Sequence, residues 1–103
     1  MVSIEADGTI VFALHQPQAR CVEVVGAFDG WHEKRLPMQR GDGGVWRLSL
    51  DPGPGQYLFR YLVDGRRWVL DTSAHGTCLS ADGCEKSRVW RPPLRLDPDA
   101  LAA

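Results

Sequence analysis

The sequence has no excess of charge of either sign, no long apolar run and no segment with sustained helical periodicity. Its 12 Lys and Arg balance 13 Asp and Glu, so a clustered basic surface for nucleic acid is not indicated. No stretch approaches the roughly 20 apolar residues that span a bilayer. The first residues show no basic region followed by an apolar run, and no signal peptide is predicted. We therefore expect a cytoplasmic protein that binds neither nucleic acid nor membranes.

Cysteine is scarce and odd in number, which argues against a disulfide framework. Cys21 falls in a strand pattern and is predicted to be a small packing residue. Cys78 and Cys84 could pair with each other, or could bind a metal together with His75 and a fourth ligand. Their spacing matches no standard zinc site, so the sequence favours free thiols. We expect no metal and no cofactor.

Turn residues are abundant: 11 Gly and 7 Pro separate short segments of alternating hydrophobicity. The length of 103 residues suits one domain. The predicted strands span residues 2–5, 9–14, 21–25, 36–38, 45–50, 56–63, 66–71 and 87–90, and residues 72–86 are predicted to be a polar loop. Short strands at this spacing favour an all-β antiparallel β-sandwich. We expect the sandwich to occupy residues 1–92 and a flexible tail to occupy residues 93–103.

The longest predicted strand has two distinct faces. The side chains expected in the core are Tyr57, Phe59, Tyr61 and Val63, and those expected to point outward are Leu58, Arg60 and Leu62. An arginine between two outward leucines suits either a binding surface or a plain solvated charge. Trp46 alternates into the core, whereas Trp90 at the end of the last strand is predicted to be a lid or interface residue.

Trp31 stands where a hydrophobic strand runs into the turn Gly26-Ala27-Phe28-Asp29-Gly30. The ring cannot be buried as a simple continuation of the alternation of that strand. Large aromatic side chains beside turns often meet ligands, and the alternative is a structural lid over a small β-domain. The sequence leaves both interpretations open at this point.

No enzymatic activity is indicated. Glycoside hydrolysis needs two carboxylates facing each other, but Asp29, Asp64 and Asp71 lie at predicted turns where no pair can be argued to converge. Cys78 and His75 form a local pair in a loop, with no third group to orient them. There is also no glycine-rich phosphate loop between a strand and a helix. We predict no catalytic residues.

The order of these motifs resembles the family-48 carbohydrate-binding modules. The matching segments are 9–14, 22–31, 36–38, 44–50, 54–65, then Trp68, Asp71 and 87–89. This family comprises the immunoglobulin-like starch- and glycogen-binding domains of the AMP-activated protein kinase beta subunit and the N-terminal domains of isoamylase and of glycogen-branching and debranching enzymes. The resemblance therefore implies an immunoglobulin-like sandwich that binds α-glucan.

The resemblance also implies a sugar site at Trp31, Arg60, Trp68 and Ser87. The two tryptophans would stack on sugar rings, and the arginine and serine would hydrogen-bond to hydroxyls. The chain carries one extra residue in the hairpin before Trp68, which can turn a strand face over. The family's apolar loop residue has no clear match, because residues 83–85 read Gly-Cys-Glu.

The expected function is non-catalytic binding of glycogen, starch or a related maltooligosaccharide, in company with a glycogen-metabolising enzyme or a kinase. The alternative is a protein-interaction or regulatory domain on the same scaffold, with weak or no sugar binding.

Overall fold

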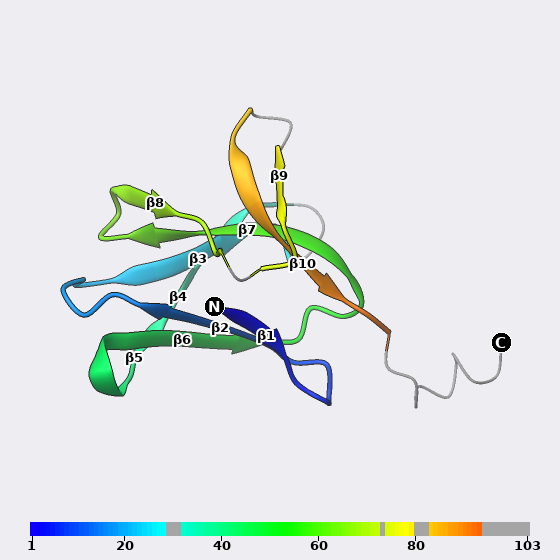
Figure 1. Ribbon diagram of the computed structural model, residues 1–103, viewed down its shortest axis with the longest axis horizontal. Helices are drawn as coiled ribbons and strands as arrows, with labels where there is room; N and C mark the ends of the chain where they lie inside the picture. The colour runs from blue at the N-terminus through cyan, green and yellow to red at the C-terminus, as the bar shows by residue number, and fades with distance from the viewer. Residues whose placement is uncertain (29–31, 73, 80–82, 94–103) are drawn as a thin grey trace, which may run out of the picture.

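The computed structural model describes residues 1–28, 32–72, 74–79 and 83–93, and these form ten strands and one short turn of helix. Figure 1 labels the ten strands in chain order. Their bounds are β1 (Val2–Ile4), β2 (Ile10–His15), β3 (Val22–Gly26), β4 (Lys34–Pro37), β5 (Gln39–Arg40), η1 (Asp42–Gly44), β6 (Val45–Leu50), β7 (Gly55–Val63), β8 (Arg67–Val69), β9 (Thr77–Leu79) and β10 (Glu85–Arg91).

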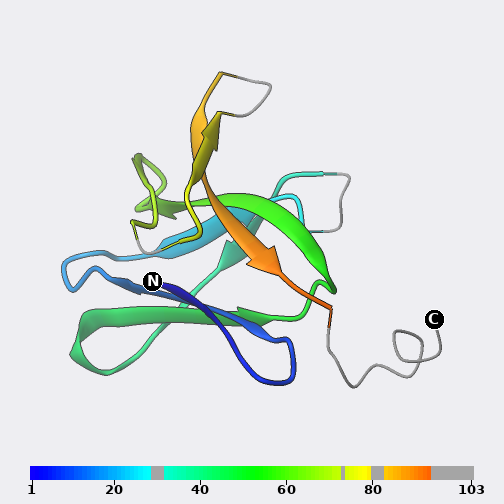
Figure 2. The same ribbon diagram turned by 45° about the vertical axis from the view of Figure 1, so that its right-hand side comes forward.

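The strands form two antiparallel sheets that lie face to face (Figures 1 and 2). One sheet has the order β1-β2-β6-β5, and the other has the order β4-β3-β7-β10-β9 with β8 also paired to β7. The predicted all-β sandwich is therefore confirmed. Within the described ranges, no helix is long and apolar enough to cross a membrane.

Aromatic rings from both sheets meet in the core. Phe12 on β2 packs edge-on against Phe59 on β7, with ring centroids 4.9 Å apart. Phe28, just beyond β3, lies 5.6 Å from Phe12 in the same cluster. Tyr61 and Val63 are buried with Phe59, as the alternation along β7 predicts. Trp46 is also buried, and its indole N–H donates to the carbonyl of Gln16.

Three local predictions from the sequence are wrong. Cys21 is exposed, because it stands just before β3 and outside the core alternation. Leu62 points outward but is only 2% exposed, since β8 is paired alongside it. The segment expected to be a polar loop contains β9, whose three residues pair with the first half of β10. The hairpin of β9 and β10 extends beyond the two layers in both views (Figures 1 and 2).

A buried polar cluster joins Asp71, which follows β8, to Tyr61 on β7 and Ser87 on β10. The hydroxyl of Tyr61 donates to Oδ2 of Asp71 at 2.6 Å. Ser87 accepts the backbone N–H of Asp71 at 2.7 Å through its Oγ. Burial, together with the hydrogen bond to Asp71, holds the pKa of Tyr61 far above its usual value. The tyrosine is therefore a permanent donor to this carboxylate.

We expect Tyr61→Phe to lower the free energy of unfolding by about 1–3 kcal/mol, because it deprives a buried carboxylate of a donor. Urea denaturation followed by tryptophan fluorescence measures this change. The matched control is Tyr57→Phe, whose hydroxyl donates to the turn carbonyls of Pro52 and Gly53. Its expected cost is smaller, about 0.5–1.5 kcal/mol. Equal losses of unfolding free energy in the two variants would show that the hydrogen bond to Asp71 stabilises the fold no more than the turn hydrogen bonds of Tyr57 do.

Candidate functional site

The hairpin of β7 and β8 decides which way Trp68 points. Asp64 and Gly65 adopt positive φ values of 55° and 66°, and the N–H of Arg66 donates to the carbonyl of Val63. Positive φ at both central positions is the geometry of a tight hairpin turn. Val63 pairs with Arg67, so the extra residue is absorbed in the turn. Trp68 consequently pairs with Leu62 and shares its face of the sheet.

Arg60 and Trp68 are brought into direct contact on this outer face. The guanidinium carbon of Arg60 lies 3.6 Å from the centroid of the Trp68 ring, which is a close cation–π contact. Trp68 remains 43% exposed. Nε of Arg60 is buried and has no hydrogen-bond partner in the described part of the chain. One face of the indole is thus supported by arginine while much of the ring stays open to solvent.

The same face carries a second arginine that sequence reasoning missed. Val25 on β3 pairs with Arg60 on one side and with Arg35 on β4 on the other. Directly paired residues point to the same face, so the two arginines flank a buried valine. Arg35 is exposed and offers further hydrogen-bond donors there. Only the register of β3 and β4 reveals it, because the sequence around residue 35 reads as loop.

Close packing explains the glycine at the end of β3. A Cβ on Gly26 would lie 2.8 Å from both the carbonyl oxygen of Leu58 and a ring carbon of Phe28. Phe28 therefore packs against the strand, and its ring lies 5.6 Å from that of Tyr57. Phe28 anchors the start of the segment that leads toward Trp31. Trp31 itself lies outside the described residues, and its role stays a prediction.

Ser87 does not fit the contact predicted for it. Its exposed fraction is 0%, and its hydroxyl is bonded to the backbone of Asp71. It points to the core side of β10, because it pairs with buried Phe59. A fully buried hydroxyl offers no surface to a sugar, so the predicted contact is wrong and Ser87 belongs to the buried polar cluster.

The loop with His75 and two cysteines shows no metal arrangement. Within the described ranges there is no group of three His, Cys, Asp or Glu side chains that could hold a metal ion. Nδ1 of His75 accepts the backbone N–H of Trp90 at 2.8 Å, which ties this loop to β10. Cys78 is a free thiol. A disulfide between Cys78 and Cys84 is therefore not formed.

The two-layer sandwich with an exposed, arginine-backed tryptophan on one outer face is a β-sandwich binding module. The family model Carbohydrate-binding module 48 (Isoamylase N-terminal domain) matches residues 2–76. The chain belongs to this family, which confirms the resemblance found in the sequence.

Relatives of this chain include 1,4-alpha-glucan branching enzymes. The chain is 36% identical over 99 residues to the 1,4-alpha-glucan branching enzyme GlgB of Paramagnetospirillum magneticum, a match that covers 89% of this chain and 13% of that enzyme. It is 38% identical over 104 residues to GlgB 2 of Rhizobium johnstonii, covering 99% of this chain and 11% of the enzyme. The chain thus spans only about an eighth of the length of these curated relatives.

Solved structures share the fold. The catalytic module of the glycogen-degrading pneumococcal virulence factor SpuA superposes with a TM-score of 0.68 at 19% identity, covering 93% of this chain and 17% of that one. The pullulanase of Anoxybacillus sp. LM18-11, crystallised with maltotetraose, superposes with a TM-score of 0.67 at 18% identity, covering 85% and 13%. At these identities the likeness concerns the fold alone.

Proposed function

We propose that this chain binds α-glucan of the glycogen and starch type, without catalysis, through the outer face of the sheet that contains β7 and β8. The observation that carries the proposal is the exposed indole of Trp68 stacked on Arg60. Family membership and the names of the relatives support the ligand class. Trp31 is proposed as a second stacking ring on the strength of the sequence resemblance.

The chemistry of this face suits a glucan chain. An α-1,4-linked glucan presents apolar C–H surfaces edged by hydroxyl groups, and indole rings offer flat surface at low entropic cost. The contact with Arg60 holds Trp68 in one orientation before a ligand arrives, which lowers the cost of binding. Because Nε of Arg60 is buried, only the outer nitrogens of the guanidinium can donate to sugar hydroxyls.

The expected affinity is modest. Stacking of a nucleic-acid base on an aromatic side chain is worth about 1–3 kcal/mol. Stacking of a sugar ring on an indole should contribute no more than this. Two rings then give dissociation constants from about millimolar to tens of micromolar after the costs of association. Such a module would act beside a separate glycogen-metabolising activity. Its relatives, about eight times longer, have room for one outside the matched region.

A chemical-shift titration tests the proposal. We expect maltoheptaose to shift the indole N–H signals of Trp31 and Trp68 at millimolar concentration and to leave the buried Trp46 signal in place. Cellohexaose is the control, because its β-1,4 linkage gives a straight chain. A straight chain should not fit a binding site for a curved α-1,4-linked glucan, so we expect smaller shifts with cellohexaose. If no indole responds to maltoheptaose at millimolar concentration, the glucan proposal fails. The protein-interaction function would then take its place.

A further inference from the structure

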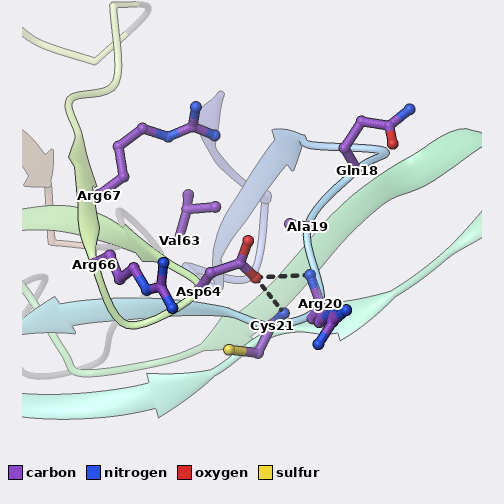
Figure 3. A pocket seen from close by; sticks show the side chains of 8 residues that line it. All are labelled: Gln18, Ala19, Arg20, Cys21, Val63, Asp64, Arg66 and Arg67. Carbon is purple, nitrogen blue, oxygen red and sulfur yellow. Dashed lines mark hydrogen bonds between the residues drawn. The ribbon is translucent and has the colours of Figure 1, made fainter.

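A recess lies at the tip of the β7 and β8 hairpin, where the turn faces the loop before β3 (Figure 3). It is an open concavity of about 730 Å³. The polar side chains that line it are Gln18, Arg20, Cys21, Asp64, Arg66 and Arg67. Arg67 precedes Trp68 on β8, so it points to the opposite face from the indole. The recess is therefore separate from the proposed glucan face.

Asp64 builds the floor of this recess. Its Oδ1 accepts the backbone N–H groups of Arg20 at 2.7 Å and Cys21 at 3.1 Å, and its own N–H donates to the carbonyl of Cys21 (Figure 3). These backbone hydrogen bonds hold the pKa of the carboxyl below its usual value, helped by the nearby charges of Arg20 and Arg67. The turn and the loop are thereby held together, and the walls of the recess are fixed relative to each other.

The recess is positively charged. Three arginines and one aspartate line it, which leaves an excess of two positive charges. Arg67 donates to the side-chain oxygen of Gln16 at 2.8 Å, which orients its guanidinium. Arg20 and Arg66 are exposed, and neither has an ion-pair partner within the described ranges. Figure 3 shows their side chains on either side of Cys21. Like charges gathered around one hollow favour an anion in it.

We propose that this recess binds a small phosphate-bearing molecule, with the phosphate held by Arg20 and Arg66. The planar fork of a guanidinium matches the oxygens of a phosphate and can bind them in pairs. The volume is larger than a phosphate alone needs and lies within the usual range for small-molecule sites. The recess therefore has room for the sugar or nucleoside that carries the phosphate. Because it is open, binding should weaken as salt rises.

An amide chemical-shift titration with sodium phosphate tests this proposal, with sodium chloride at matched ionic strength as the reference. We expect phosphate-specific shifts at Arg20, Cys21 and Arg66. Arg20→Gln and Arg66→Gln should each weaken phosphate binding roughly tenfold, since each removes a hydrogen bond to a charged group. Arg47→Gln is the matched control: Arg47 is an exposed arginine on β6 in the other sheet, and its loss should change nothing.

The carrier of the phosphate is identified by parallel titrations with glucose 6-phosphate and adenosine monophosphate. Tighter binding of either one than of inorganic phosphate supports the proposal and names the class of ligand. Equal shifts in phosphate and chloride overturn it, as does an equal loss in the Arg47→Gln control. Tighter binding of hexaglutamate than of any phosphate also overturns it, because the recess would then be a docking site for an acidic protein segment. None of these outcomes depends on glucan binding.

Discussion

Replacing Trp68 by alanine is expected to weaken binding of maltoheptaose at least about fivefold while the sandwich stays folded. The indole is 43% exposed, so its stacking surface is available to a ligand and its removal opens no large cavity in the core. One stacked ring is worth about 1–3 kcal/mol, which corresponds to roughly five- to more than a hundredfold in affinity. Isothermal titration calorimetry or retardation in a glycogen-containing gel measures the loss. Trp68→Phe should retain part of the binding, because a smaller flat ring remains.

The matched control for this variant is Trp90→Ala. Trp90 is 49% exposed and lies on β10 in the same sheet, but it pairs with Gln56 and not with the part of β7 beside Trp68. We expect this variant to bind glucan like the wild type. Equal losses at Trp68 and Trp90 would indicate non-specific adhesion to exposed aromatic rings. Trp31→Ala completes the series and should abolish binding, if the second ring is where the sequence predicts it.

Replacing Phe12 by alanine is expected to cost about 3–5 kcal/mol of the free energy of unfolding, the largest effect on stability that we predict. Phe12 is fully buried and touches the rings of Phe59, in the other sheet, and of Phe28, just beyond β3. Its removal leaves a cavity between the two layers that rigid strands cannot close. Because domains of this size are stable by only about 5–15 kcal/mol, the variant should melt far below the wild type.

Val11→Ala is the control for the Phe12 variant, since it removes apolar atoms from the same strand on its outer face. Val11 pairs with Ser3 and Ser49, and it is only half-buried. We expect it to cost less than about 1 kcal/mol, mainly through lost strand propensity. Both variants are measured by urea denaturation. A loss at Phe12 no larger than at Val11 would mean that the aromatic cluster does not hold the sheets together.

The alternation of apolar and polar residues along the strands was sufficient to predict most of the core. A strand repeats every two residues, so the buried faces of β2, β6 and β7 could be read from the positions of Phe12, Trp46 and Phe59. The Asp64-Gly65 turn could likewise be recognised, because a tight hairpin requires residues that tolerate positive φ. The candidate pair Arg60 and Trp68 was found through the family resemblance, but their contact was not.

Predictions failed where a side chain's surroundings come from a distant segment. Leu62 has the outward position that the alternation assigns, yet β8 beside it leaves it buried. Ser87 has a hydroxyl suited to a sugar, but this hydroxyl is buried and accepts a hydrogen bond from the backbone N–H of Asp71. Cys21 lies one residue before the strand in which it was expected to pack. For Leu62 and Ser87 the position on the strand was predicted correctly but the burial or its cause was not, whereas for Cys21 the start of the strand was also misplaced by one residue.

The sequence by itself determined most of the strands, the core faces of the long ones and the family, because these depend on the order of residues along the chain and on the two-residue period of a strand. The short strands β5 and β9 were missed. Only the tertiary structure decided that Trp68 stacks on Arg60, that Arg35 shares their face and that three arginines surround one recess. These arrangements depend on strand register and on a turn that absorbs one extra residue. A shift of one residue in either would place every side chain of the strand on the opposite face.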